Sequence, residues 1–430
     1  MALFEPGKIL KDDAGATIKI IKHLADGGQG DVYVVEYMGK KKALKWYKPD
    51  VLSEPDAFYK NLEKNAGRKS PDKAFLWPEA ITERRDGSFG YIMDLKPDGY
   101  EELSKYLGSD DCNFASFKSA TEACIRIVSA FRILHNNGYS YQDLNDGNFF
   151  IEPTTGDVRI CDNDNVAPNG THTRILGKPR YMAPEIVVGD GKVLPNTQSD
   201  RHSLAVILFL VLFCGHPLEG EHWCVPCMTD ELAKLLYGID PIFIFDPNDR
   251  SNRPKGNVHI EPLKRWPCMP DYVKELFLMA FSKQALKDPN HRPRELDWLN
   301  MLVRFRSDIV NCPCGDEVFI RNSASAICDC CGRTIVIKNR IKLPHYSITA
   351  AKGSRIYRCQ LGTCNPEDAL EPIALVVAKP DGTLGVKNMT PYILKAFTPG
   401  GKEKLVHPQE IIPFISGIKI EVFDKTIELN

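Results

Sequence analysis

The sequence has almost no excess of either charge, with 55 Lys and Arg residues against 56 Asp and Glu residues. This balance gives no reason to expect a nucleic-acid partner or a membrane surface as partner. Residues 1–15 lack the long apolar run of a signal peptide. The longest apolar run, residues 204–214, is too short to cross a bilayer and predicts a buried helix. We therefore expect a cytoplasmic protein without nucleic-acid or membrane partners.

Internal repeats and low-complexity tracts are also lacking, so a solenoid or a disordered chain is not indicated. A length of 430 residues, 43% of them hydrophobic, suggests two or three globular domains. Residues 17–48 read as strands around a glycine-rich turn, and a helix is expected near 55–66. Residues 80–95 predict a hairpin that turns at Asp86-Gly87. From about 100 to 300 the pattern is mainly helical, and after about 305 a cysteine cluster and short strands follow.

Two features near the start suit phosphate binding. Gly27, Gly28 and Gly30, in LADGGQGDVY, let the backbone approach a phosphate and offer it amide N–H groups. Lys45, in KKALKWY, is flanked by apolar residues and is expected to point toward a charged partner. Each signal is weak alone, because simple turns are often rich in glycine and a lone strand lysine is usually solvated.

The stretch YQDLNDGN places Asp143 and Asn148 five positions apart. A carboxylate can accept the proton of an attacking hydroxyl, and an amide oxygen is a hard ligand suited to Mg²⁺. The alternative is a surface turn, since Asp and Asn favour turns. Asp162 follows a short hairpin, nineteen positions after Asp143. The order of the glycine turn, Lys45 and these residues carries more weight than any one of them.

In that order the segments resemble the protein kinase superfamily, of a divergent serine/threonine type. Its glycine loop reads G-x-G-x-x-G-x-V, and Ala25, Gly27, Gly30 and Val32 stand in those places, so the first glycine is missing. The segment GKPRYMAPE ends at Glu185 and resembles the family's protein-substrate platform. Further expected parts are Asp200, which would hold the catalytic loop, and Arg292, which would pair with Glu185.

The resemblance implies Mg²⁺ and ATP as cofactors and a protein as substrate. Asp143 would be the base, and Lys45 would hold the α- and β-phosphates and pair with Glu63, or with the runner-up Glu54. Asn148 and Asp162 would bind Mg²⁺. The remaining nucleotide-binding positions are Gly27, Gly28, Gly30 and Val32 over the phosphates and Met93, Asp94 and Leu95 beside the adenine.

Several residues depart from the family pattern. Asn145 and Lys178 stand where a lysine and a threonine are usual. We expect Lys178 to reach back to Asp143 and the γ-phosphate and to replace the missing cation; the alternative is a solvated lysine. Asp164 adds a second carboxylate to an Asp-Asn-Asp triplet; we expect it to face solvent, and metal binding is the alternative. Gln142 replaces an arginine that binds phosphate on the activation segment in many relatives.

Five cysteines lie within residues 312–331. Cys312, Cys314, Cys328 and Cys331 are expected to hold Zn²⁺ in a closed, structural site. Cys330, Cys359 or Cys364 are possible substitutes, and chance clustering of buried thiols is the alternative. The pair Cys224 and Cys227 is expected to be structural.

Residues 341–430 predict a small β-sandwich that is faintly similar to forkhead-associated domains, which bind phosphothreonine. The segment GTLGVKNMT has the glycine and asparagine of such a loop but lacks the expected arginine. A docking or packing module is therefore the default, and a phosphoprotein or regulatory partner is a weaker hypothesis.

The predicted fold class is α+β: a bilobal kinase fold, then a zinc ribbon, then a β-sandwich. The expected domains are 1–305, with an N-lobe of about 1–95 and a C-lobe of about 96–305, then 306–340 and 341–430. The expected function is Mg-ATP-dependent transfer of phosphate to protein Ser or Thr hydroxyls, with Thr171 and Thr173 as possible autophosphorylation sites. One alternative is a nucleotide-binding pseudokinase scaffold. A second is a small-molecule kinase, although the YMAPE segment argues against it.

Overall fold

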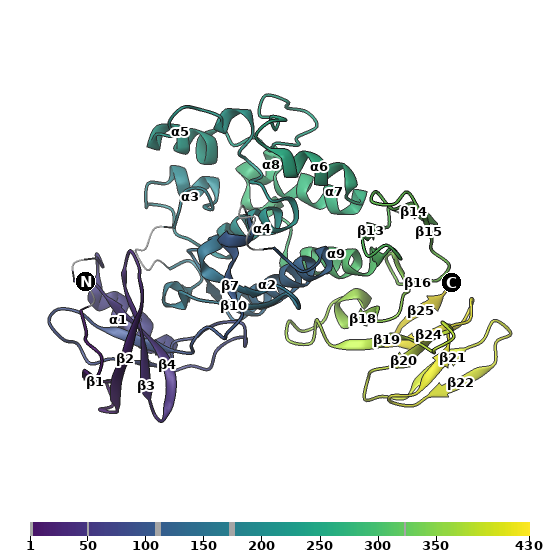
Figure 1. Ribbon diagram of the computed structural model, residues 1–430, viewed down its shortest axis with the longest axis horizontal. Helices are drawn as coiled ribbons and strands as arrows, with labels where there is room; N and C mark the ends of the chain where they lie inside the picture. The colour runs from purple at the N-terminus through teal and green to yellow at the C-terminus, as the bar shows by residue number, and fades with distance from the viewer. Residues whose placement is uncertain (1–2, 50, 108–112, 172–176, 322–323) are drawn as a thin grey trace.

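The computed structural model describes residues 3–49, 51–107, 113–171, 177–321 and 324–430. The chain runs from an N-terminal sheet, through a helical region, to a β-rich C-terminal region (Figure 1). This arrangement confirms the predicted α+β class with a β-rich tail. Among these residues no helix combines the length and the apolar character that a bilayer span requires.

The N-terminal region is an antiparallel sheet in the order β1-β2-β3-β4-β6-β5. One helix, α1, follows β4 where the sequence predicted it. The predicted turn is present, since Asp86 and Gly87 both have positive φ angles, 52° and 78°. The bounds are β1 Ile9–Lys11, β2 Thr17–Asp26, β3 Gly30–Tyr37, β4 Lys40–Tyr47, α1 Pro55–Ala66, β5 Ala80–Ile81 and β6 Gly90–Met93.

The helical region is built around α2 (Phe117–Asn136) and α4 (Thr197–Phe213), which pack in one large core. The apolar run at 204–214 lies in α4, where every residue from Ser203 to Phe213 is buried, as predicted. The longer helices around them are α6 Ile260–Cys268, α7 Asp271–Ala280 and α9 Glu295–Asp308; the short ones are α3 Pro184–Val188, α5 Asp230–Lys234 and α8 Lys283–Lys287.

Short strands in this region position the loops of the site. One small sheet has the order β10-β9-β7, and a two-stranded sheet joins β8 with β11. The predicted catalytic loop therefore runs from the end of β8 to the start of β9, and Asp162 follows β10. The bounds are β7 Glu101–Glu102, β8 Tyr139–Ser140, β9 Phe149–Glu152, β10 Asp157–Ile160 and β11 Ala167–Pro168.

Beyond α9, two small hairpins carry the cysteines: β12 (Ile309–Asn311) pairs with β13 (Glu317–Phe319), and β14 (Ser325–Ile327) pairs with β15 (Thr334–Val336). Two sheets follow, in the orders β17-β16-β25-β24-β21-β22 and β18-β19-β20-β23, and side chains from both share one core. Their bounds are β16 Arg340–Lys342, β17 Ser347–Thr349, β18 Arg355–Tyr357, β19 Pro372–Ala378, β20 Leu384–Asn388, β21 Leu394–Phe397, β22 Glu403–Val406, β23 Ile411–Pro413, β24 Lys419–Val422 and β25 Lys425–Leu429.

The tail is fastened to the helical region by polar contacts and by shared core residues. The buried Asp308 carboxylate, at the end of α9, accepts hydrogen bonds from the Thr349 amide at 3.1 Å and hydroxyl at 2.8 Å. Glu317 of the first cysteine hairpin accepts from the Phe117 amide at the start of α2. Tyr357 and Cys359 belong to the core of the helical region. The cysteine hairpins and the tail therefore pack against α2 and α9.

Candidate active site

Apolar side chains from the N-terminal sheet and from the helical region meet beside the predicted site. Val32 on β3, Leu95 after β6, Phe150 on β9 and Cys161 before Asp162 are only partly buried, and they pack against one cluster. A half-buried apolar surface of this kind suits a flat aromatic ring. Val32 and Leu95 were predicted to contact the nucleotide; Phe150 and Cys161 were not, although both flank predicted site residues.

The glycine-rich loop is a tight turn between β2 and β3. The Gly27 amide donates to the Gly30 carbonyl oxygen at 2.9 Å. A Cβ at Gly30 would lie 2.3 Å from the Trp46 carbonyl oxygen, so only glycine fits there. Gly28 meets no such neighbour. The loop also brings the Gln29 side chain within 3.4 Å of Lys45 Nζ, so it lies directly over the predicted lysine.

Lys45 is buried and bridges two carboxylates, with its Nζ 3.0 Å from Asp162 Oδ1 and 3.0 Å from Asp164 Oδ2. Burial alone would lower the pKa of Lys45, but the two carboxylates outweigh it and raise the pKa above its ordinary value. The ammonium group therefore stays charged.

The prediction that Glu63 pairs with Lys45 is wrong in this structure. Glu63 is exposed on α1, and Lys45 pairs with Asp162 and Asp164 instead. The side of α1 that faces the site carries Asn61 and Asn65, whose amides donate to the Val166 carbonyl oxygen at 2.9 and 2.8 Å. The runner-up Glu54 is exposed at the N-terminus of α1.

The prediction that Asp164 faces solvent is also wrong. Its side chain is fully buried, and besides Lys45 it accepts hydrogen bonds from the hydroxyls of Tyr47 and Tyr91. These tyrosines lie on β4 and β6, so the N-terminal sheet itself covers the carboxylate. The Asp-Asn-Asp triplet was the sequence signal for this second acid, but its burial depends on residues more than 70 positions away.

The catalytic loop is held by Asp200 at the start of α4. Its carboxylate accepts from the backbone amides of Tyr141 at 2.6 Å and Gln142 at 3.1 Å, as the resemblance implied. Within the loop, the Asn148 side-chain amide donates to the Asp143 carbonyl oxygen at 2.8 Å. The amide oxygen of Asn148 is then the atom that can serve a cation.

Asp143 is largely buried, and burial raises its pKa to about 6, with the negative charge of Asp162 acting in the same direction. The Asn145 side chain donates to Asp143 Oδ1 at 3.2 Å, and together with the positive charge of Lys178 it opposes the rise. The carboxylate is therefore mostly ionised at neutral pH but is a stronger base than an exposed aspartate.

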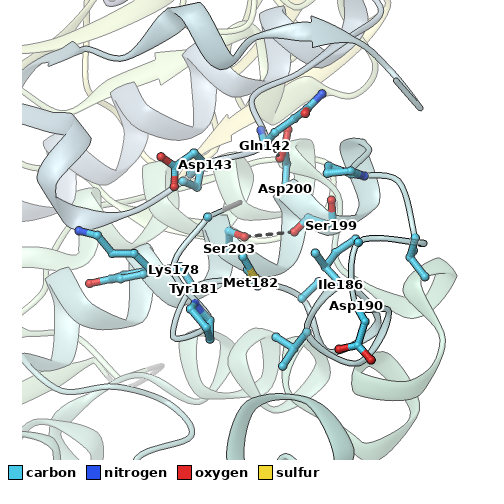
Figure 2. A pocket seen from close by; sticks show the side chains of 18 residues that line it. Gln142, Asp143, Lys178, Tyr181, Met182, Ile186, Asp190, Ser199, Asp200 and Ser203 are labelled. Carbon is cyan, nitrogen blue, oxygen red and sulfur yellow. Dashed lines mark hydrogen bonds between the residues drawn. The ribbon is translucent and has the colours of Figure 1, made fainter. Parts of the chain in front are cut away.

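Lys178 lies at the catalytic loop, but it contacts Asn145 rather than Asp143: its Nζ donates to Asn145 Oδ1 at 3.1 Å. Lys178, Tyr181 and Asp143 line a pocket of about 350 Å³ between the activation segment, which ends at Glu185, and the start of α4, which contributes Asp200 and Ser203 (Figure 2). Its other walls are mostly apolar and include Leu144, Met182, Ile186 and Val187.

Two contacts fix the activation segment around this pocket. Arg292 donates to both oxygens of Glu185, at 2.8 and 2.6 Å, and this confirms the expected ion pair. The Gln142 amide donates to the Thr171 carbonyl oxygen at 2.9 Å. A neutral side chain thus holds the segment where many kinases use an arginine. Thr173 lies outside the described residues.

At the hinge position, Met93 is buried at the end of β6, while the exposed Asp94 side chain binds Lys42 at 2.7 Å. The Asp94 side chain therefore points to Lys42 on β4. The predicted contact with adenine would therefore be made by the backbone groups of Asp94 and Leu95.

The four predicted zinc ligands come together. The Sγ atoms of Cys312, Cys314, Cys328 and Cys331 all lie within 4.8 Å of one another, with the closest pairs at 3.6 Å. Tetrahedral Zn²⁺ with bonds of about 2.3 Å places its sulfurs about 3.8 Å apart, so this donor set fits the ion. Cys359 and Cys364 lie elsewhere: Cys359 is in the helical core, and Arg132 contacts Cys364.

Residues 88–242 match the family model of the protein kinase domain. Among curated proteins, the chain is 27% identical over 283 residues to protein kinase C delta type of Mus musculus, covering 60% of this chain and 40% of that protein. It is 27% identical over 285 residues to serine/threonine-protein kinase Sgk1-A of Xenopus laevis, covering 65% and 55%. The match therefore spans less than two thirds of either relative. These matches, with the fold, support a member of the protein kinase superfamily.

Proposed function

We propose that this protein is a Mg-ATP-dependent protein kinase that transfers the γ-phosphate to serine or threonine hydroxyls. The observation that supports it best is the site around Asp143. A partly buried carboxylate with a raised pKa lies in a loop fixed by Asp200, beside a charged lysine bridged to Asp162. A pseudokinase commonly lacks at least one of these groups, so the presence of base, lysine and metal-binding aspartate together supports phosphate transfer.

Asp143 is the proposed base. With a pKa of about 6 it is ionised at neutral pH and can still accept the proton of an attacking hydroxyl. The hydrogen bond from Asn145 orients the carboxylate without neutralising it. Its contribution is to place the hydroxyl and accept its proton while the phosphoryl group is transferred.

Lys45 would neutralise the α- and β-phosphates, and Asn148 and Asp162 would hold Mg²⁺. The side chains of Asn148 and Asp162 offer hard oxygen ligands, which Mg²⁺ prefers. The ion would supply positive charge to the phosphates. Asp162 has a left-handed backbone, with φ of 53°. Such a conformation is uncommon for aspartate, and functional sites often contain one.

Lys178 is the proposed second cation. Its ammonium approaches the catalytic loop from the activation segment and binds Asn145, the residue that also holds Asp143. A lysine here can stabilise the charge that develops on the transferred phosphoryl group. It takes over from the other side of the site the role of the lysine that Asn145 replaces.

A protein is the favoured acceptor. The pocket beside Asp143 is lined by residues of the YMAPE segment, which the Glu185–Arg292 pair fixes, and we propose that it receives the acceptor side chain. In the C-terminal region we propose a structural zinc site and a docking or packing module. Asn388 is buried, and its side-chain amide donates to the Tyr392 and Val406 carbonyl oxygens. Because the Asn388 side-chain amide is already used within the tail, this loop does not favour phosphothreonine binding.

The test is phosphate transfer from γ-labelled ATP with Mg²⁺, offered to the protein itself, to a generic protein and to a metabolite mixture. Wild type should label protein, and Asp143→Asn should lower the rate by about 10²- to 10⁴-fold. Asp381→Asn, at an exposed turn of the tail, is the control and should behave as wild type. Nucleotide binding without transfer would select the pseudokinase scaffold, and label on metabolites alone would select a small-molecule kinase.

A further inference from the structure

We propose that Asp164 is the positioning residue for Lys45 and takes the role that other kinases give to a glutamate on the helix. The inference rests on the proposed function, because it concerns how the lysine is held for the phosphates. It assigns a task to the last residue of the Asp-Asn-Asp triplet, which would otherwise duplicate the neighbouring metal-binding aspartate.

Both oxygens of Asp164 are occupied by donors from the N-terminal sheet. Oδ2 receives Lys45 Nζ at 3.0 Å and the Tyr47 hydroxyl, and Oδ1 receives the Tyr91 hydroxyl at 3.3 Å. Burial, together with the charge of Asp164, raises the pKa of both tyrosines well above the usual value, so the hydroxyls remain donors. The carboxylate is therefore fixed on two sides and cannot swing to solvent.

The two aspartates that hold Lys45 differ in exposure. The Asp162 side chain is 33% exposed, whereas that of Asp164 is 0% exposed. Asp162 can therefore turn toward a cation on the nucleotide, and Asp164 stays with Lys45 when it does. A buried ammonium without an anionic partner is strongly unfavourable, so a fixed carboxylate beside it has a clear physical role.

Helix α1 supplies no carboxylate to Lys45 in this structure. Glu63 is exposed, and the inward amides of Asn61 and Asn65 bind the Val166 carbonyl oxygen. The helix is thus tied to the segment after Asp164 by neutral hydrogen bonds. Phe58 of α1 packs against Tyr47, so the helix supports the Lys45–Asp164 pair by apolar packing and supplies no charge to it.

The experiment compares Asp164→Asn with Glu63→Gln in the full chain, measuring kcat and the KM for ATP, with the melting temperature as the folding control. Asp164→Asn keeps the shape of the side chain and removes its charge. We expect kcat/KM for ATP to fall by about 10²-fold, with changes in both constants, and Glu63→Gln to stay within about twofold of wild type. A loss for Glu63→Gln with none for Asp164→Asn would overturn the inference, as would an Asp164→Asn variant with a lower melting temperature and normal kinetics.

Two further measurements keep the inference testable. If Asp164→Asn does not fold, Tyr47→Phe removes one donor to Asp164 and should raise the KM for ATP several-fold; an unchanged KM would overturn the inference. If wild type transfers no phosphate, the proposed function fails, and Mg-ATP binding by calorimetry decides the inference separately. Binding that is about tenfold weaker in Asp164→Asn and unchanged in Glu63→Gln supports it, and equal binding by all three proteins contradicts it.

Discussion

Lys178 and Asp143 are connected through one amide: Lys178 Nζ donates to Asn145 Oδ1 at 3.1 Å, and Asn145 Nδ2 donates to Asp143 Oδ1 at 3.2 Å. A cation from the activation segment therefore influences the proposed base, Asp143, without forming an ion pair with it. A direct pair would favour the ionised carboxylate and weaken it as a base. The relay keeps positive charge near the acceptor site and leaves Asp143 able to take a proton.

Removing that cation should slow transfer. We expect Lys178→Met to lower kcat by about 10- to 10²-fold with little change in the KM for ATP, because the negative charge that the lysine would stabilise develops in the transition state. Lys192→Met, which removes an exposed cation in the loop after α3, should leave kcat unchanged. A normal kcat for Lys178→Met would show that this lysine is only solvated.

The pH dependence of transfer should report Asp143. Burial raises its pKa to about 6, so kcat/KM should be constant at neutral pH and should fall as the pH drops through about 6. The charge of Lys178 lowers the pKa of Asp143, so in Lys178→Met this acidic limb should move to higher pH. A pH–rate profile of both proteins measures the shift, and a limb that moves to lower pH would contradict this electrostatic account.

The buried His135 should make stability depend on alkaline pH. Burial lowers its pKa, but hydrogen bonds with Asp200, at 3.1 Å, and Glu295, at 2.8 Å, outweigh burial and raise the pKa to about 9. Because the folded-state pKa lies above the unfolded value, the stabilisation is complete below about pH 6.5 and is lost as the pH rises through about 9.

Urea unfolding of wild type between pH 6 and 10 should show a loss on the order of 2–3 kcal/mol from this group. His135→Gln should be less stable at pH 6 and should lack this part of the pH dependence. The contact between His135 and Asp200 also supports the candidate active site, because Asp200 holds the loop that carries Asp143. Equal pH dependence in the two proteins would mean that His135 is neutral in the folded state.

The cysteine hairpins should bind one zinc ion per chain. Cys314→Ser removes one of the four clustered thiols and should abolish stoichiometric zinc, measured by elemental analysis, and lower the melting temperature. Cys330→Ser changes an exposed neighbour outside the cluster and should keep the metal. Stoichiometric zinc in Cys314→Ser, or none in wild type purified with zinc present, would contradict the site.

Local sequence was enough to predict the parts of the site that lie within one loop. The turn at Asp86-Gly87, the loop around Asp143 and the four cysteines each depend on residues a few positions apart, so spacing carries the information. Glu63 failed for a different reason. The segment predicted a helix, but which of its faces packs against the sheet is decided by Phe58 and Leu62 contacting distant aromatic residues.

Asp164 shows the limit most clearly. Its surroundings are tyrosines on β4 and β6, 117 and 73 positions earlier in the chain, and nothing near the triplet indicates that they cover it. The attachment of the tail is of the same kind, because the contact between Asp308 and Thr349 joins elements 41 positions apart. Long-range packing determines both, and a single sequence does not display it.

The most direct measurement is transfer of labelled γ-phosphate from Mg-ATP to protein by wild type and by Asp143→Asn, at equal folded concentration. The account predicts phosphoserine or phosphothreonine with wild type and a loss of about 10²- to 10⁴-fold with Asp143→Asn. Equal labelling by the two proteins, or none by wild type under conditions where it binds Mg-ATP, would contradict it.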